Sequence, residues 1–588
     1  MAGIRAFISR EKILLLSFLL VIAVFAITRL PFFLYFPLAD IDVDTFNYYT
    51  LVDQMNKGIW PAFIIRTPGY PLFLKLVFTF HDSHIAVVLV QNLITLFTAL
   101  FFVYIVHLVF KDRSRYFALL AAMGIGVFIS STCHLESDTS LLTESLYVNL
   151  LLLFFAFFLL ALNRDKHRWW IVTSIIAASV VLFRPSGMFL LPVVLFILIF
   201  LFFNPFKKAF LLSLALPVVL ILALASLYNY FTIRSFSVSN FTEHAFFSYA
   251  SLFTEKSPDF DPVVNEGIDT YRKRIKPRHS DVIFNSFTMA EVRNVMAKYY
   301  NRNRVTFFNF LRSRENPEEF NLYMKWRPLL KKIAMHEIKR RPDLYLKFTT
   351  CNLGFYFFLI REKNDFYGTI KSRYAQAITA GRDYPDIFFN KQGQTRLDQN
   401  GLRIYYKKEY AESIDRRFLA FFLKEYLDPL SPRFPSISIS LPPETRQEDV
   451  ADTSIKGSRK LIIPPLFLQR LHVGFEKVHI FLFQRKAWVL FFFFAVIFSL
   501  VQLIRSRFHD RVAFFMFVLT GAAVLQAIGV CMTTFPIHRY SYTMEFAYYL
   551  SFFLFPLFLV RKKEKNVSKP LEEKGFRAGT EARPDNLS

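Results

Sequence analysis

The sequence has very little cysteine: Cys133, Cys351 and Cys531 are the only three in 588 residues. Their spacing matches no metal-binding motif, and they are too few for a disulfide framework. This excludes a small disulfide-stapled fold and a cysteine-based zinc or iron–sulfur site. The chain also contains no internal repeat, and its formal net charge of +25 is scattered along apolar sequence. A nucleic acid is therefore not the expected partner of these basic residues.

The beginning of the chain lacks a small-residue cleavage site. Basic residues between Arg5 and Lys12 precede a long apolar run, as they do in a secretory signal peptide. The run is longer than the apolar part of a signal peptide. We therefore expect a retained first membrane helix with its N-terminus in the cytoplasm.

What the sequence has in abundance is apolar and aromatic residues. They make up 54% hydrophobic content, with 73 Phe. An apolar run of about 20 residues crosses a bilayer as a helix, because backbone groups in lipid must bond to one another. The runs predict an all-α membrane protein of about ten transmembrane helices, at 13–36, 85–109, 116–132, 141–162, 169–183, 188–203, 209–231, 487–504, 512–532 and 545–560. Basic clusters in alternate short loops follow the positive-inside rule.

These runs divide the chain into four parts. Residues 1–231 form an N-terminal transmembrane module whose first outer loop, 37–71, includes juxtamembrane helices. Residues 232–485 are expected to be a large, mostly helical extracytoplasmic insertion. The last three spans lie within 486–560, and the charged tail 561–588 is expected to be disordered in the cytoplasm.

One segment, 344–360, allows two interpretations. It is long enough for a short span, but Lys347 and the preceding basic residues also suit a helix at the membrane interface. A span here would require a compensating one elsewhere, and the interfacial interpretation is preferred.

The first outer loop carries acids at alternate positions, Asp40, Asp42 and Asp44, directly after a membrane helix. Asp44 begins a helix-like run to about Lys57, where it can act as a helix cap. A carboxylate fixed at this depth also suits a general base that takes a proton from an attacking hydroxyl. Asp42 is the second catalytic candidate, and Asp40 and Asp42 are candidate oxygen ligands for a divalent cation. Tyr48 lies one turn further on the same helical face, where it suits a sugar-binding role.

Further charged residues fall at helix ends on the same predicted side. The turn motif R-T-P-G-Y-P offers Arg66 for a phosphate and Tyr70 for a substrate, although Arg66 also suits an interfacial anchor. Glu144 begins the fourth span, as a functional acid or as a solvated helix start. Arg184 follows the fifth span. Arg539 and Tyr540 precede the last span, and these arginines suit either lipid head groups or a substrate phosphate.

The order of these motifs resembles the GT-C superfamily of polytopic glycosyltransferases. The motifs are D-x-x-x-Y after a first span, R-T-P-G-Y-P, T-E-S-L-Y, F-R-P-S-G, and R-Y before a late helix. Similar families include protein O-mannosyltransferases, lipid A aminoarabinose transferases and mycobacterial arabinosyltransferases. The likeness covers mainly residues 1–230 and, loosely, the last three spans.

The resemblance implies an inverting enzyme that takes a sugar from a polyprenyl-phosphate carrier and transfers it on the extracytoplasmic side. Asp44 matches the catalytic aspartate, and the motif from Arg66 matches the turn that closes the first loop. Aminoarabinose transferases carry glutamate-lysine-proline-proline near this turn. Here the place reads R-T-P-G, which argues against a metal bound there. No W-W-D-x-G signature is present, which argues against an oligosaccharyltransferase.

Three other functions were compared with this one. A lipid or solute transporter, or a flippase, tends to have related halves and charges near the bilayer midplane. A scaffold needs no acids and arginines on one face. An O-antigen-ligase-like enzyme works mainly through its late loop. The sequence favours a glycosyltransferase of the bacterial inner membrane whose active site faces the periplasm, with membrane lipids around it and a glycan, lipid or protein as acceptor.

Overall fold

The computed structural model describes the chain in segments separated by short gaps. These are residues 11–35, 43–63, 66–81, 84–164, 166–204, 208–239, 242–286, 288–314, 322–358, 396–398, 401–404, 437–439, 470, 474, 477, 486–533 and 542–558. Within these segments the architecture is helical except for a small three-stranded sheet. In this sheet β1 (Arg396–Asp398) is antiparallel to β2 (Gly401–Ile404), which runs parallel to β3 (Ile437–Ile439).

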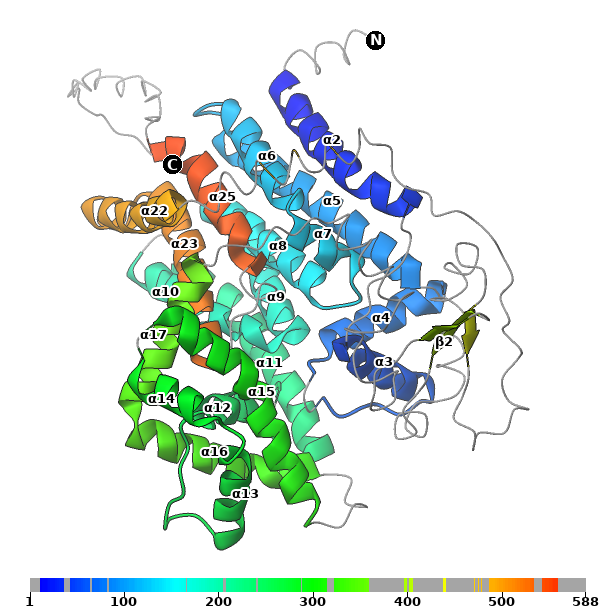
Figure 1. The fold of residues 1–588 in the computed structure, drawn as a ribbon. Helices are drawn as coiled ribbons and strands as arrows, with labels where there is room; N and C mark the ends of the chain where they lie inside the picture. Colours follow the sequence, from blue (N-terminus) through cyan, green and yellow to red (C-terminus); the bar gives the residue numbers. More distant parts are fainter. Residues whose placement is uncertain are drawn as a thin grey trace, which may run out of the picture.

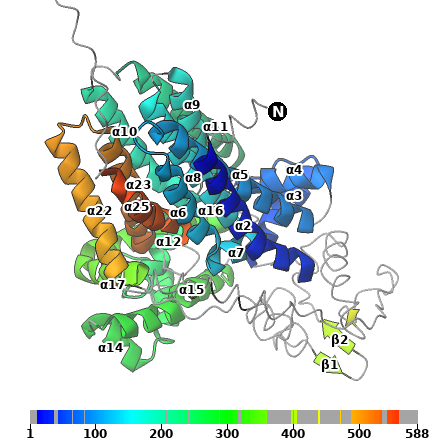
Figure 2. The same ribbon diagram turned by 90° about the horizontal axis from the view of Figure 1, so that it is seen from above.

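The N-terminal part is a bundle of long apolar helices (Figures 1 and 2). Its members are α2 (Lys12–Tyr35), α5 (His84–Phe110), α6 (Tyr116–Ile129), α8 (Glu144–Asn163), α9 (His167–Phe183), α10 (Leu190–Phe203) and α11 (Leu211–Ile233). Helix α8 packs between α5 and α9, α9 packs on α11, and α2 packs on α6. Three later helices complete the bundle: α22 (Lys486–Arg505), α23 (Arg511–Thr533) and α25 (Glu545–Leu554). Helix α23 contacts α22, α8 and α25, and α25 also packs on α6.

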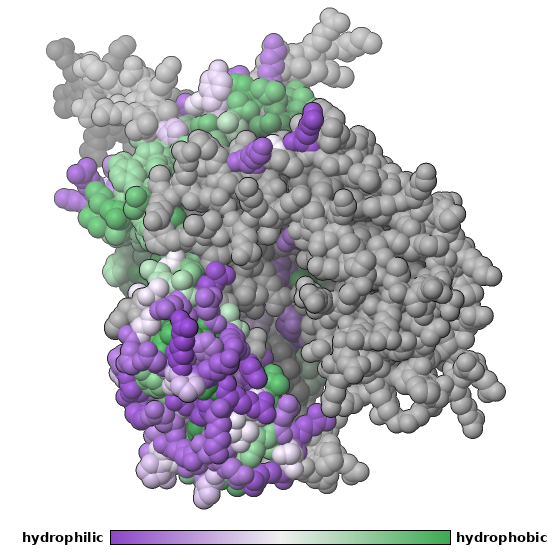
Figure 3. Space-filling model, viewed as in Figure 1, coloured by the Kyte–Doolittle hydropathy of each residue, from purple (hydrophilic) through white to green (hydrophobic). Residues whose placement is uncertain are grey.

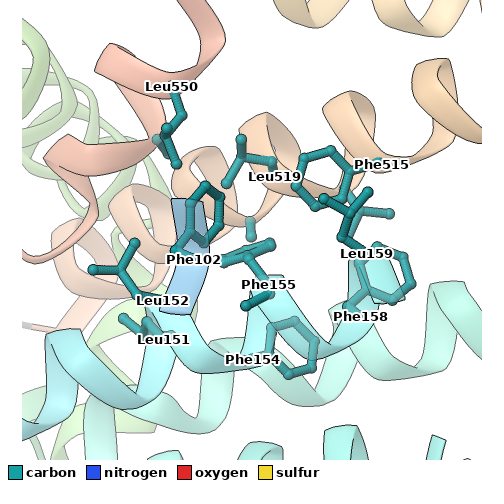
Figure 4. Close-up of a cluster of buried hydrophobic side chains, with 14 of the residues drawn as sticks. Phe102, Leu151, Leu152, Phe154, Phe155, Phe158, Leu159, Phe515, Leu519 and Leu550 are labelled. Carbon is teal, nitrogen blue, oxygen red and sulfur yellow. The ribbon is translucent and has the colours of Figure 1, made fainter. Parts of the chain in front are cut away.

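Aromatic side chains fill the centre of the bundle. Figure 4 shows Phe102 of α5, Phe155 and Phe158 of α8 and Phe515 of α23 within one buried cluster. Lipid tails are as apolar as these side chains, so helices in a membrane associate through close packing rather than through exclusion of water. Large flat rings supply many such contacts, which explains why this chain uses so much phenylalanine.

Six helices in the described part of the chain are long and apolar enough to cross a membrane. They are Lys12–Leu30, Ala86–Phe110, Glu144–Asn163, Pro185–Phe203, Lys208–Ile233 and Arg511–Thr533. Helices Tyr116–Ile129 and Cys133–Thr139, bent by 69°, would make a seventh if they form one broken span. The protein is therefore an integral membrane protein with six or seven candidate spans among the described residues. The expected spans at 169–183, 487–504 and 545–560 coincide with shorter apolar helices, so a count of about ten is not shown.

A second helical unit follows α11. It consists of α12 (Thr242–Ala250), α13 (Pro262–Arg272), α14 (Pro277–Asn285), α15 (Met289–Arg312), α16 (Leu322–Arg340) and α17 (Pro342–Phe358). The unit has its own core, which includes Phe253, Tyr271, Phe307 and Phe348. The face of this unit seen in Figure 3 is mostly hydrophilic, whereas more apolar residues show on the bundle. The described part of the predicted 232–485 region thus begins as a helical unit with a buried apolar core of its own.

Helix α17 covers most of the ambiguous segment 344–360. Its Leu344 and Phe348 belong to the core of the helical unit, whereas Tyr356 packs with Ala527 and Val530 of α23. Helix α17 is not among the helices long and apolar enough to cross a membrane. It connects the helical unit to the bundle, which agrees better with the interfacial interpretation than with a span. The tail 561–588 lies outside the described residues.

Candidate functional site

Helix α3 (Val43–Asn56) carries the first part of the site. Its buried residues, Thr45, Tyr48, Tyr49, Val52 and Met55, recur at intervals of one helical turn and so form one apolar face. The helix ends at Asn56, and Gly58 soon after it has a φ of 76°, the left-handed conformation that often follows a helix. Asp44 lies in the first turn of α3, where its negative charge interacts favourably with the positive end of the helix dipole.

Helix α4 (Gly69–Phe80) packs against α3, and the two lie together beside the bundle (Figure 1). Lys75 of α4 donates a hydrogen bond to the carbonyl of Met55 at 3.0 Å, which caps the end of α3. The loop between the helices is held by α11, because Tyr228 Oη donates to the Pro61 carbonyl at 3.1 Å. These contacts fix the position of the segment that carries Arg66.

Arg66 forms an ion pair with Asp44 at the start of α3. Its guanidinium carbon also lies 5.1 Å from the centre of the Tyr48 ring, within range of a cation–π contact. Burial raises the pKa of the Tyr48 phenol; Arg66 and Arg184 oppose this rise, while Glu144 and Asp44 add to it. Tyr48 is therefore neutral at physiological pH and acts as a hydrogen-bonding and packing group.

Glu144 and Arg184 form a second ion pair. The distance from Arg184 Nη1 to Glu144 Oε1 is 2.8 Å, and both side chains are buried. Thr143 Oγ1 donates to the other carboxylate oxygen at 3.2 Å. The interpretation of Glu144 as a solvated helix start was wrong, because only 3% of the residue is exposed.

A tight turn positions Arg184. This residue ends α9 in an extended conformation, and Pro185 starts the short helix η1 (Pro185–Phe189). Proline suits this place because it has no N–H to leave unpaired. Gly187 then lies against α9 so closely that a Cβ atom there would be 2.7 Å from the Val180 carbonyl oxygen. Only glycine allows this approach.

The two ion pairs face one cavity of about 420 Å³. This volume lies within the range of about 300–1,000 Å³ that is typical of small-molecule sites. Two carboxylates and two guanidinium groups line it together with Tyr48. The rest of the lining comes from Thr67, Thr143, Pro185, Ser186, Met188, Phe189, Pro192, Ala245, Leu525, Gln526, Ile528, Gly529, Val530 and Thr533. The site is thus polar on the α3 and α8 side and largely apolar along η1, α10 and α23.

The structure brings together five of the residues predicted from the sequence: Asp44, Tyr48, Arg66, Glu144 and Arg184 all line the cavity. Tyr70 does not line it.

Tyr70 packs edge-on behind Tyr48, with ring centres 4.9 Å apart, and donates to Gln91 Oε1 at 3.0 Å. Tyr70 therefore holds Tyr48 in place and does not contact the cavity in which a substrate would bind. Asp42, Arg539 and Tyr540 lie outside the described residues, so their predicted roles stay predictions.

A buried polar network lies next to the site and was not anticipated. Asp138 of α7 (Thr132–Thr139) is completely buried and pairs with Arg29 of α2 at 2.8 Å. Its other carboxylate oxygen accepts hydrogen bonds from Thr95 at 3.0 Å and Ser145 at 2.6 Å. His134, Glu136 and Asp138 follow the apolar run 116–132 in the sequence. Neither His134 nor Asp138 is exposed, so both side chains lie inside the protein.

Two residues of the cavity wall were also missed. Gln526 and Gly529 lie within the apolar run of α23, and the mean hydropathy of that run stays high in spite of them. The available signal was a single amide side chain inside a membrane span, since a polar group there needs a partner.

A metal site is not evident in the described part of the chain. No group of three or more His, Cys, Asp or Glu residues there could hold a metal ion. Asp40 and Asp42 lie outside that part, so the suggestion of a divalent cation is neither supported nor contradicted.

A comparison with known families bears on the class of this protein. Residues 65–229 match the model of a family described as dolichyl-phosphate-mannose-protein mannosyltransferase. This segment is therefore similar to a family of membrane glycosyltransferases, and the match covers less than half of the chain. The resemblance read from the motifs is thereby confirmed over this segment, and the family's description implies a lipid-phosphate sugar as donor. The matched segment includes Arg66, Glu144 and Arg184, whereas Asp44 precedes it. No curated protein matches the chain.

The first prediction concerns the buried ion pair. Asp138→Asn leaves the Arg29 charge buried without its partner, and we expect a loss of about 3–5 kcal/mol in stability. The measurement is the midpoint of thermal unfolding in detergent, with Asp112→Asn in an exposed loop as the control. The double variant Arg29→Met, Asp138→Leu should regain part of the loss. An Asp138→Asn midpoint equal to that of Asp112→Asn would contradict the prediction.

The second prediction concerns the turn at Arg184. Gly187→Ala must push η1 away from α9, because the new Cβ would contact backbone atoms of Val180. Displacement of a catalytic-site group by about 1 Å can lower rates by about 10²-fold, so we expect a loss of this order in kcat/KM for the lipid-linked donor. The control is Gly521→Ala in α23, where a Cβ would meet nothing within 4 Å. Equal kcat/KM in both variants would show that the close approach is unimportant.

Proposed function

We propose that this enzyme transfers a sugar from polyprenyl phosphate to a cell-envelope acceptor on the extracytoplasmic side, with inversion at the anomeric carbon. The observation that carries the proposal is the cavity in which Asp44–Arg66 and Glu144–Arg184 face each other at the ends of membrane helices. A lipid-linked substrate needs such a position, where its head group reaches polar residues while its chain stays in lipid.

The two arginines are proposed to bind the donor phosphate. In the cavity each guanidinium group is neutralised by one carboxylate. A phosphate offers planar guanidinium groups several oxygen acceptors and competes for them through charge-assisted hydrogen bonds. When the bond between the anomeric carbon and the phosphate oxygen breaks, negative charge grows on the departing lipid phosphate. Arg66 and Arg184 stabilise that charge in a site with little water.

Asp44 is proposed as the general base. The acceptor oxygen attacks the anomeric carbon, its proton passes to the Asp44 carboxylate, and the lipid phosphate leaves with the bonding electrons. Transfer of Arg66 from Asp44 to the phosphate would raise the proton affinity of the carboxylate at the moment when the donor is present. Tyr48 and Glu144 are proposed to shape the pocket around the sugar or the acceptor. Asp42, Arg539 and Tyr540 remain candidates for this site from the sequence alone.

The apolar wall suits the beginning of the polyprenyl chain. It is made by Met188, Phe189, Pro192, Leu525, Ile528 and Val530. These side chains come from η1, α10 and α23, which are part of the bundle, so an isoprenoid chain could continue from the cavity into lipid. The basic clusters on the opposite ends of the helices support a periplasmic or exterior site.

The third prediction tests the base. Asp44→Asn keeps the size of the side chain but cannot accept a proton, and we expect transfer to fall by about 10²–10⁴-fold while donor binding is retained. The measurement is sugar transfer by purified protein in liposomes, with polyprenyl-phosphate sugars as donors and envelope fractions as acceptors.

The matched control is Asp53→Asn, on the same helix. Asp53 is paired only with Lys57 in the described structure, by a surface contact at 2.7 Å, so its loss should leave transfer unchanged. A folded Asp44→Asn protein with the wild-type rate would exclude Asp44 as the base.

A further inference from the structure

Gln526 is an unusual residue for its place. It lies within the apolar helix α23, is only 2% exposed and lines the cavity. Its Nε2 donates a hydrogen bond to Thr543 Oγ1 in the short helix η5 (Tyr542–Met544). This bond fixes the orientation of the amide, so the carbonyl end of the side chain has a defined direction.

The carbonyl oxygen of Gln526 lacks a hydrogen bond to any residue that the structure describes, although it is buried. A buried acceptor without a donor costs about 1–3 kcal/mol relative to one that is paired. A ligand hydroxyl that donates to this oxygen would recover that free energy. The same ligand without the hydroxyl would leave the acceptor unpaired, which is how polar sites discriminate strongly between related substrates.

Gly529 provides space beside this amide. It follows Gln526 by three residues, so both lie on one face of α23, and both line the cavity. A Cβ atom at Gly529 would meet nothing within 4 Å. The glycine is therefore not required for helix packing, and its small size leaves cavity volume on the face of α23 that carries Gln526.

We propose that this face of α23 recognises the sugar of the donor: Gln526 Oε1 accepts a hydrogen bond from a sugar hydroxyl, and Gly529 leaves room for the ring. The proposal rests on the polyprenyl-phosphate donor and adds a residue that selects the sugar. A polyprenyl chain has no hydrogen-bond donor, and a phosphate at neutral pH mainly accepts and is drawn to Arg66 and Arg184. A hydroxyl is the group that fits, and the donor sugar is its source in this proposal.

The fourth prediction is tested by binding in the absence of acceptor. The probes are polyprenyl phosphate, polyprenyl-phosphate mannose and the monodeoxy analogues of the latter, each lacking one hydroxyl. Wild-type protein should bind the mannosyl donor about 10-fold more tightly than one of the analogues. Gln526→Met keeps the volume but removes the acceptor, and it should bind these two equally. Wild type and Gln526→Met should bind polyprenyl phosphate alone with the same affinity.

The matched control is Thr520→Val, on the same helix. The Thr520 hydroxyl bonds to the Met516 carbonyl of its own helix at 2.8 Å, and the residue does not line the cavity. This variant should discriminate between the donors as the wild type does. Gly529→Leu places a large side chain in the cavity, so it should weaken binding of the mannosyl donor more than binding of polyprenyl phosphate. The helix itself should tolerate the change, because a Cβ atom at Gly529 would meet nothing within 4 Å.

Several results would overturn the proposal. Equal affinity of wild type for polyprenyl phosphate and the mannosyl donor would show that no sugar hydroxyl contributes. Unchanged discrimination in Gln526→Met would exclude this oxygen, and an equal loss for all ligands would indicate a structural role. Failure of the proposed function would give a different result: the wild type would bind the donors but would transfer no sugar.

Discussion

The site depends on a charge pair buried among membrane helices. Arg29 and Asp138 are each at most 1% exposed, and moving two charges out of water costs more than their attraction usually returns. The pair is tolerable because Thr95 and Ser145 satisfy the remaining carboxylate oxygen. These partners come from α2, α5, α7 and α8, so the network fixes four helices relative to one another. A purely apolar interface would allow small sliding motions that this arrangement forbids.

The network reaches the cavity through backbone groups. The carbonyl of Asp138 accepts a hydrogen bond from Gln91 at 3.2 Å, and Gln91 accepts one from Tyr70 at 3.0 Å. The Tyr70 ring in turn supports Tyr48, over which Arg66 lies. Groups that act on a transition state must be held in place before the reaction begins. Here the fixed reference is the interior of the bundle, and helices α3 and α4 pack against each other and, through α4, against the bundle.

Much of the site could be predicted because charged residues next to apolar runs must lie at the ends of membrane helices, outside the lipid. Asp44, Arg66, Glu144 and Arg184 all follow or precede apolar runs on one predicted side, and helices of a bundle bring such ends together. Asp138 could not be predicted in the same way. Its neighbours in sequence are polar, a pattern typical of a loop. The sharp bend between α6 and α7, which buries these residues, has no signal in the sequence pattern. Hydropathy likewise hides Gln526, because one amide barely changes the average of an apolar helix.

Helix α23 connects the cavity with the helical unit outside the bundle. The last carbonyl groups of any helix lack partners within it. At the end of α23 the unit supplies them, since Tyr345 donates to the Met532 carbonyl at 2.8 Å and Tyr300 donates to that of Thr533 at 3.0 Å. Thr533 also lines the cavity. The same helix therefore forms a wall of the site and receives contacts from the unit, so displacement of the unit would alter the shape of the cavity that holds the substrate.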